Sequence, residues 1–323
     1  MFVRNKTPFK VGLAHGQLAE GRSVGALVVC SAYRASSGKL APCEEPPALP
    51  TDPPDLTRQA LWSGTSVTAA GDVYGPRSSP FVRMISLFVG NVARRLSVFG
   101  DRHWAPGLTG ELEPSAPARF ERIALSFARA YGGHVDVPPG LFPGTDLPFP
   151  GGRLAYPLNA GGIGFHLDKA AAGGRPLPNF ELPDQLLEHW NDRPTPGCFV
   201  PCPELPALRM APPASAQWGP RTPDELFPFA LRTLHHAPGY LVFDDVPPGT
   251  PIRVEGLGRE ALHLEAPPPP ARVVLRRGAR REGVRPQLRS VHVDADRAVV
   301  SCVHGHAFVY RDGDEPSWVL VDI

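Results

Sequence analysis

The chain has almost no net charge, few cysteines and no long apolar run, and each shortage excludes a class of protein. Its 33 lysines and arginines balance 32 aspartates and glutamates, which gives a formal net charge of +1. Such a chain has no general field that would attract nucleic acid or an anionic lipid surface. Apolar runs such as Gly25–Cys30 are short, well below the about 20 residues of a membrane-spanning helix. We therefore expect no nucleic-acid binding and no membrane insertion.

Cysteine is scarce, and the first residues lack the pattern of an export signal. Met1–Phe9 carries charges and a proline, where a secretory signal needs an apolar core of about 7–15 residues. Five cysteines are an odd count, and without an export signal we interpret them as reduced thiols. We expect the protein to stay in the cytoplasm.

Proline and glycine, in contrast, are abundant. The 41 prolines and 33 glycines interrupt the chain almost everywhere, and between them lie short segments with the composition and alternation of strands. They predict a mainly β protein with antiparallel, sandwich-like sheets, long ordered Gly/Pro-rich loops and a few short helices. The predicted strands are Ala26–Tyr33, Ser66–Val73, Val82–Val89, Arg95–Phe99, Tyr240–Phe243, Thr250–Val254, Ala261–Leu264, Arg272–Leu275, Arg289–Val293, Ala298–Val303 and Ala307–Tyr310.

We interpret residues 1–323 as a single β-rich domain. Its strands begin in 20–131, a loop-rich excursion follows in 132–220, and a helix with the C-terminal strands occupies 221–323. Two helices are predicted, Pro183–Trp190 and Thr222–Leu234, the second with an N-cap threonine followed by proline.

The loop-rich excursion has too many aromatic residues to be an idle linker. Tyr156, Phe165, Phe180 and Phe199 are of the kind that packs inside proteins, so we expect ordered loops laid over the sheets. We also expect the strands after Arg272 to continue the same β architecture, because the linker before them is short.

Three short motifs suggest catalysis and fail on their context. Gly21–Gly25 matches the Gly-x-Ser-x-Gly nucleophile elbow, but a strand follows where the elbow needs a helix. Gly161–Gly164 lacks the lysine of a phosphate-binding loop. Cys198 and Cys202 are four residues apart, not the three of a Cys-x-x-Cys pair. None of the three predicts an active site.

One cluster keeps a metal site open. Cys302, His304 and His306 alternate along a predicted strand, so one face would present a thiolate and two imidazoles to an ion. A metal-dependent hydrolase is therefore an alternative, although the sequence shows no fourth ligand. The other interpretation is an ordinary strand with a buried cysteine and histidines near its end.

Seven short motifs follow one another along the chain. They are Ser63-Gly-Thr-Ser-Val67 with Gly71-Asp-Val-Tyr-Gly-Pro76, Val98-Phe-Gly-Asp-Arg-His-Trp104, Phe127-Ala-Arg-Ala-Tyr-Gly-Gly133, Leu158-Asn-Ala-Gly-Gly-Ile-Gly-Phe165, Pro176-Leu-Pro-Asn-Phe-Glu181, Thr195-Pro-Gly-Cys-Phe199, and Asp224-Glu-Leu-Phe through Ala237-Pro238. In this order they resemble the domain-of-unknown-function family 2169, encoded beside spike proteins of type VI secretion. Ala160, Gly239–Tyr240 and Cys302–His304 depart from the pattern of that family.

The resemblance implies an adaptor or chaperone that binds a toxin effector and helps to load it onto the VgrG–PAAR spike, with no turnover and no cofactor. A structural component of a contractile injection particle is a second alternative. Aromatic-rich loops suit a binding module, and we expect exposed aromatic side chains to cluster on it. The candidate partner-binding or motif residues are Asp101, Arg102, Trp104, Tyr131, Gly132, Gly133, Asn179 and Glu181.

The same residues also have a purely structural interpretation. Asp101 and Arg102 would pair with each other at a strand end and Trp104 would lie in the core. Tyr131–Gly133 and Asn179–Glu181 would shape turns, with glycine supplying positive φ and asparagine local hydrogen bonds. The sequence leaves both interpretations open.

Overall fold

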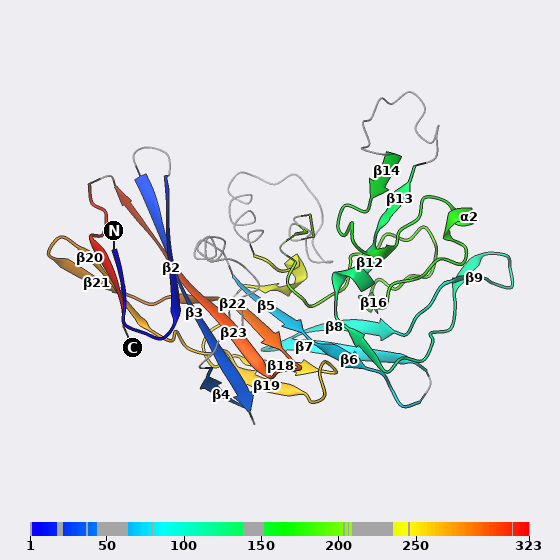
Figure 1. Ribbon diagram of the computed structural model, residues 1–323, viewed down its shortest axis with the longest axis horizontal. Helices are drawn as coiled ribbons and strands as arrows, with labels where there is room; N and C mark the ends of the chain where they lie inside the picture. The colour runs from blue at the N-terminus through cyan, green and yellow to red at the C-terminus, as the bar shows by residue number, and fades with distance from the viewer. Residues whose placement is uncertain are drawn as a thin grey trace.

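The computed structural model describes residues 2–17, 22–36, 38–43, 64–78, 80–137, 152–202, 204–205, 207–208, 235–244, 246–311 and 313–322, and most of its elements are strands (Figure 1). They are β1 (Phe2–Asn5), β2 (Lys10–Gln17), β3 (Arg22–Ser36), β4 (Lys39–Pro42), β5 (Thr65–Ala70), β6 (Asp72–Tyr74), β7 (Val82–Val89), β8 (Val92–Phe99), β9 (Trp104–Pro106), β10 (Leu112–Pro114), β11 (Arg122–Ala124), the 3-10 helix η2 (Phe127–Arg129), β12 (Tyr131–Gly132), β13 (His134–Asp136), β14 (Arg153–Ala155), β15 (Ile163–Gly164), α2 (Lys169–Ala172), β16 (Phe180–Glu181), the 3-10 helix η4 (Gly239–Leu241), β17 (Val242–Phe243), β18 (Pro251–Glu255), β19 (Leu262–Glu265), β20 (Arg272–Arg277), β21 (Arg280–Val284), β22 (Gln287–Asp294), β23 (Val299–Arg311) and β24 (Trp318–Asp322).

Two sheets enclose the main core. A seven-stranded sheet runs in the order β17-β5-β22-β23-β3-β2, with β4 paired to β3, and a five-stranded sheet runs in the order β16-β8-β7-β18-β19. Val67 and Val291 from the first sheet join Leu87 and Ile252 from the second in one fully buried apolar cluster. The sequence expectation of a mainly β, mostly antiparallel fold is confirmed.

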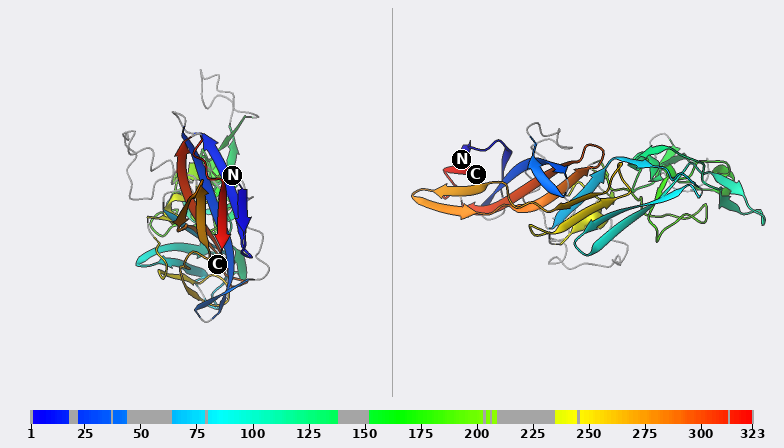
Figure 2. Two further views of the ribbon diagram at one scale, coloured as in Figure 1. Left: turned by 90° about the vertical axis from the view of Figure 1, so that its left-hand side faces the viewer. Right: turned by 90° about the horizontal axis from the view of Figure 1, so that it is seen from below.

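A separate four-stranded sheet lies at one end of the molecule, where both termini are found (Figure 2). Its order is β1-β24-β20-β21, and β1 runs parallel to β24. Val273, Val319 and Val321 point to a second buried cluster that also takes Leu27 and Phe308 from β3 and β23. Residues beyond 272 are therefore divided, because β22 and β23 lie in the seven-stranded sheet while β20, β21 and β24 do not.

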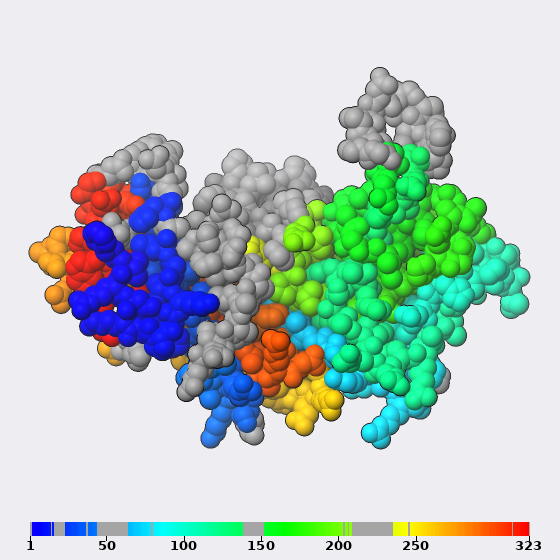
Figure 3. Space-filling view, in the orientation of Figure 1, coloured from blue at the N-terminus to red at the C-terminus, as the bar shows by residue number. Residues whose placement is uncertain are grey.

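The opposite end of the molecule carries a layer of loops and very short strands (Figure 1), which forms the green end of the space-filling view (Figure 3). It includes the two-stranded pairs β9–β10, β12–β15 and β13–β14 and the single turn of helix α2. Trp104, Tyr131, Tyr156 and Phe165 are buried in a third apolar cluster inside this layer. The described part of the loop-rich excursion is thus ordered, with Tyr156 and Phe165 in this cluster and Phe180 and Phe199 in the main core.

The structure corrects several boundaries. The predicted strand Ser66–Val73 is broken at Gly71, which has a φ of +145° and separates β5 from β6. The two predicted strands Ala298–Val303 and Ala307–Tyr310 are one strand, β23, because Gly305 stays in register opposite Val28. The helix predicted over Thr222–Leu234 lies outside the described residues.

The helix predicted over Pro183–Trp190 is wrong. The Leu187 N–H donates to Glu181 Oε2 at 2.9 Å, and the N–H groups of Glu188 and His189 both donate to Asp192 Oδ2. In a helix these groups would donate to carbonyls four residues earlier. Carboxylates that offer local hydrogen bonds compete with the helix and here replace it by turns.

In the described residues no helix combines the length and the apolar character that crossing a bilayer requires.

Candidate functional site

An ion pair between Arg102 and Glu181 lies at the centre of the candidate residues. Strand β16 pairs with β8 so that Glu181 is opposite Ser97, which brings Glu181 next to the segment that follows β8. Arg102 Nη2 contacts Glu181 Oε1 and also donates to the Pro178 carbonyl at 2.9 Å. Both side chains are buried. The pair therefore ties the end of β8 to the chain around β16 in a medium that screens charge weakly.

Burial opposes the charge of both partners. It raises the pKa of the Glu181 carboxyl above its usual range, an effect that Arg102 and the Leu187 N–H oppose, and it lowers the pKa of Arg102. The Arg102 guanidinium also lies over the Phe99 ring, 3.6 Å from its centroid, a cation–π contact that helps to replace lost hydration. A buried pair of this kind fixes geometry more than it adds stability.

Asn179 joins the chain before β16 to the end of β8 and to the 3-10 helix η2. Its Nδ2 donates to the Phe99 carbonyl and to Asp101 Oδ1, both at 3.0 Å, and its Oδ1 accepts from Arg129 Nη1 at 3.1 Å. Asp101 thus pairs with Asn179, and the expected Asp101–Arg102 pair is wrong. Side chains of neighbouring residues on an extended chain point in opposite directions, so Arg102 turns inward while Asp101 stays exposed.

Tyr131 and the two glycines after it form the second part of the site. The Tyr131 hydroxyl donates to the Asp192 carbonyl at 2.8 Å and accepts from Arg193 Nη1 at 3.3 Å, and its ring meets Tyr156 edge to face. Gly132 has a φ of +147°, and a Cβ there would collide with the Asn159 carbonyl. The sequence prediction that glycine provides positive φ here is confirmed.

Trp104 is buried in the same apolar cluster as Tyr131. Strand β9 holds it, since the Trp104 N–H donates to the Arg175 carbonyl and the Trp104 carbonyl accepts from Gly174. Its core placement agrees with the structural interpretation. All eight candidate residues therefore belong to one connected region, the loop layer and its junction with β8.

Sequence reasoning gave no role to three residues that complete this network, namely Arg129, Asn159 and Arg193. Asn159 Nδ2 donates to the Phe127 and Tyr131 carbonyls at 2.8 and 3.0 Å, and Arg193 Nη2 donates to the His166 carbonyl. Asn159 stands inside the motif Leu158–Phe165, so its position between a leucine and three small residues was the available signal. Arg129 likewise stands inside the motif Phe127–Gly133. Arg193 belongs to no motif, and its partners Tyr131 and His166 are distant in sequence.

The family is decided by comparison with known proteins. A model described as "Uncharacterized protein conserved in bacteria (DUF2169)" matches residues 42–304, which include all eight candidate partner-binding or motif residues. The chain belongs to this family. No curated protein and no solved structure matches the chain. The description of the family names no activity, partner or ligand.

The expectation of clustered exposed aromatics is wrong for the described residues. Tyr131, Tyr156 and Phe165 are buried inside the loop layer. Among the exposed large apolar side chains of the described residues the only aromatic one is Phe2, on β1 at the other end of the molecule. The aromatic residues instead fill the third cluster, because loops without regular backbone pairing need side chains to hold them.

The three residues of the possible metal site do not gather around one point. Cys302, His304 and His306 lie on β23, which rises about 3.3 Å per residue, so the first and last are about 13 Å apart along the strand. Zinc ligands lie within about 2.3 Å of the ion. Within the part of the chain that the structure describes, no group of three or more His, Cys, Asp or Glu side chains could hold a metal.

All five cysteines lie in described segments and none forms a disulfide. Burial raises the pKa of the Cys198 and Cys30 thiols to about 12 and raises that of Cys302 as well. These three therefore stay protonated at neutral pH, which agrees with their interpretation as reduced thiols and gives them no nucleophilic character.

Proposed function

We propose that the protein is a non-enzymatic adaptor of bacterial type VI secretion that binds a toxin effector in the cytoplasm and helps to load it onto the VgrG–PAAR spike. The proposal draws on the DUF2169 membership and on the genetic setting that the motif resemblance implies. The observation that carries it is the inward use of the motif side chains. Arg102, Tyr131 and Glu181 are buried and bonded within the chain.

Inward motif residues suit a scaffold better than a reactive centre. A catalytic group must reach substrate, whereas a binding module gains affinity when its loops are ordered before the partner arrives. The Arg102–Glu181 pair, the Asn179 bonds and the Tyr131 cluster order such loops. They therefore support a role in which the loop layer offers a preformed surface to another protein.

Affinity purification of the tagged protein from its own bacterium, followed by quantitative mass spectrometry, tests the proposal. We expect a toxin to be recovered together with a PAAR or VgrG protein through moderate salt. Recovery of the protein alone would contradict the adaptor role. Purified secreted particles provide the second measurement, since a loading adaptor should be absent from them and a structural component of the particle should be present.

The hairpin between β9 and β10 offers a variant for this experiment. It extends from the end of the loop layer (Figure 1), and Leu108 at its tip is completely exposed. We expect Leu108→Asp to lower recovery of the partners several-fold while the melting temperature stays the same. Thr109→Asp, which adds the same charge at the next exposed position, is the matched control. Recovery of the partners at the wild-type level with Leu108→Asp would show that this hairpin is not the contact surface.

A further inference from the structure

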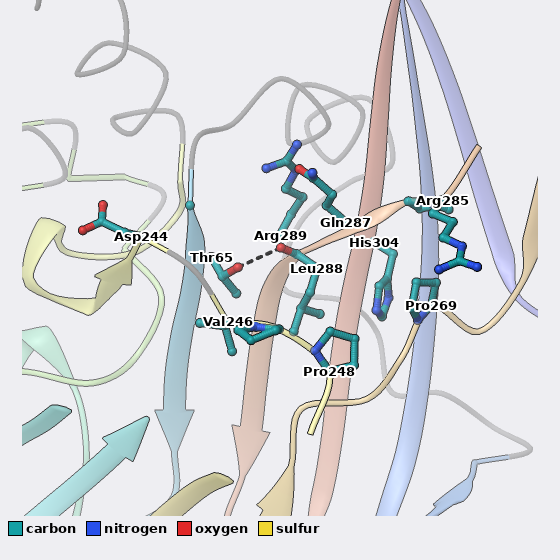
Figure 4. A pocket seen from close by; sticks show the side chains of 13 residues that line it. Thr65, Asp244, Val246, Pro248, Pro269, Arg285, Gln287, Leu288, Arg289 and His304 are labelled. Carbon is teal, nitrogen blue, oxygen red and sulfur yellow. Dashed lines mark hydrogen bonds between the residues drawn. The ribbon is translucent and has the colours of Figure 1, made fainter. Parts of the chain in front are cut away.

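A pocket of about 760 Å³ lies beside the seven-stranded sheet, and none of the eight candidate partner-binding or motif residues lines it (Figure 4). Five segments that are distant in sequence form it: the start of β5, the turn after β17, the proline-rich linker before β20, the turn into β22 and strand β23. Its size is within the about 300–1,000 Å³ of pockets that bind small molecules or peptide side chains. The lining residues are Gly64, Thr65, Asp244, Val246, Pro247, Pro248, Pro269, Arg285, Pro286, Gln287, Leu288, Arg289 and His304.

Cationic groups exceed anionic groups in this lining. Arg285 and Arg289 contribute two guanidinium groups and Asp244 one carboxylate, which lies at the other end of the pocket in Figure 4. Among the described residues neither arginine forms a salt bridge, and the buried Nε of Arg289 has no hydrogen-bond partner. Buried donors in proteins are nearly always bonded, so Arg289 is ready for an acceptor that the chain itself does not supply.

His304 adds an acceptor on the wall of the pocket. Its side chain is fully buried, its Nε2 is 3.4 Å from the Pro267 carbonyl, and its Nδ1 has no hydrogen-bond partner among the described residues. A carbonyl only accepts, so the proton is on Nε2 and Nδ1 is an acceptor. Burial lowers the pKa of His304 to about 4, which keeps the ring neutral at physiological pH. An N–H group of a ligand would satisfy Nδ1.

We propose that this pocket binds an extended peptide segment that carries a carboxylate next to an apolar side chain. The carboxylate pairs with Arg289, a backbone N–H donates to His304 Nδ1, and the apolar side chain covers the proline rings, while Arg285 adds positive charge at another side of the pocket. We take the segment to be part of a protein that this chain loads, and this step rests on the proposed function. The binding chemistry of the pocket does not depend on that function.

The lining favours a peptide over other anions. A free phosphate or acetate displaces only a few water molecules of about 30 Å³ each, and would leave the proline faces and His304 without partners. A nucleotide or single-stranded nucleic acid is usually held by stacking on aromatic rings, and His304 is the only ring of that kind among the described lining residues. A peptide supplies carboxylate, N–H and apolar surface together.

Peptide display on the purified full chain tests the inference. A random dodecapeptide library is selected on the wild-type protein, and the enriched peptides are synthesised and measured by fluorescence anisotropy. We expect enrichment of Asp or Glu beside an apolar residue, and at least tenfold weaker binding of these peptides to the Arg285→Gln/Arg289→Gln variant. Replacing the peptide carboxylate by its amide should weaken binding equally, and His304→Phe should weaken it several-fold.

Arg280→Gln/Arg281→Gln is the matched control, because it removes the same charge from two exposed positions on β21. Equal loss with this control, or no enriched peptide, would overturn the inference. Displacement of the peptide by inorganic phosphate at the peptide's own affinity would make the pocket a simple anion site and overturn it too. Circular dichroism checks folding of each variant, and the exposed Arg285→Gln alone provides the comparison where the double variant is unfolded.

The two proposals fail separately. Acidic peptides that bind the pocket of the purified chain, with no secretion protein recovered from the bacterium, would leave the pocket assigned and remove the adaptor role. Recovery of a toxin that is unchanged by Arg285→Gln/Arg289→Gln, together with no selected peptide, would leave the adaptor role and remove the pocket.

Discussion

Arg102 and Glu181 depend on each other, because water hardly reaches either side chain. We expect Glu181→Gln to lower the free energy of unfolding by about 3–5 kcal/mol, the usual cost of leaving one charge of a buried pair without its partner. Replacing both residues, as Arg102→Met/Glu181→Leu, should cost less than the single change. Urea denaturation measures the difference.

A surface pair provides the control for this comparison. Arg153 and Asp136 are joined at 3.3 Å with both side chains largely exposed, so Arg153→Gln should change stability by no more than about 1 kcal/mol. A Glu181→Gln effect as small as this would show that the buried pair does not fix the loop layer.

His304 makes stability depend on pH. Its pKa is about 4 in the folded chain against about 6.5 when unfolded. Between these values the unfolded chain binds more protons, so stability is complete above pH 6.5 and is lost as pH falls towards 4. We expect His304 to account for about 2–3 kcal/mol of the loss between pH 7.5 and 4.5.

Comparison of variants over that pH range isolates this contribution. We expect His304→Leu to reduce the loss of unfolding free energy between pH 7.5 and 4.5, measured by urea denaturation, by about 2–3 kcal/mol. His263→Leu, at an exposed position on β19, should show the same loss as the wild type. If His304→Leu loses as much unfolding free energy as the wild type over this pH range, His304 does not contribute to the pH dependence.

Single elements depend on side-chain bonds as well as on strand pairing. On η4 the Tyr240 hydroxyl accepts from the Cys198 N–H at 2.8 Å and donates to the Cys198 carbonyl at 2.6 Å. The next carbonyl, that of Phe199, accepts from the Ala69 N–H of β5. Tyr240 therefore holds the segment that completes the bonding of β5.

We expect Tyr240→Phe to cost about 1–3 kcal/mol, because it leaves a buried N–H without an acceptor. Hydrogen exchange of the Ala69 amide should become faster, since the Phe199 carbonyl loses its support. Tyr74→Phe on the half-buried strand β6 is the matched substitution and should leave exchange at Ala69 unchanged. Unaltered exchange of the Ala69 amide in Tyr240→Phe would show that its bond to the Phe199 carbonyl does not depend on the Tyr240 hydroxyl.

On the scale of the whole molecule, the three apolar clusters predict that damage stays local. Val319 of β24 is fully buried in the cluster of the four-stranded sheet, while Trp104 and Tyr131 belong to the cluster of the loop layer at the other end. We expect Val319→Ala to cost about 1–3 kcal/mol and to speed hydrogen exchange in β20, β21 and β24 but not in β9 or β12. Uniform acceleration would show that the molecule opens as one unit.

Leu320→Ala is the control for that experiment. It lies at the next position of β24, on the half-exposed face, so it should have a small effect on exchange everywhere.

Local pattern alone predicted several of the longer strands but missed β2, β21 and β24. Strand β7 has the predicted bounds, because alternating apolar residues between turn formers fix both period and length. Short strands such as β12 and β16 carry no such period, since two residues cannot show one. The helix predicted over Pro183–Trp190 is wrong although its local sequence suits a helix. Its N–H groups donate to the carboxylates of Glu181 and Asp192, and these bonds form only in the folded chain.

The sequence by itself determined the β class, the family and the identity of the eight candidate residues. Each of these depends on residues that are close together in the sequence, as apolar alternation or as a short motif. The tertiary structure alone decided that Arg102 pairs with Glu181 and not with Asp101, that the loop aromatics face inward, and that Arg285, Arg289 and His304 share a pocket. Such relations join residues that the chain separates, and the free energy that selects them comes from burial, which local sequence does not record.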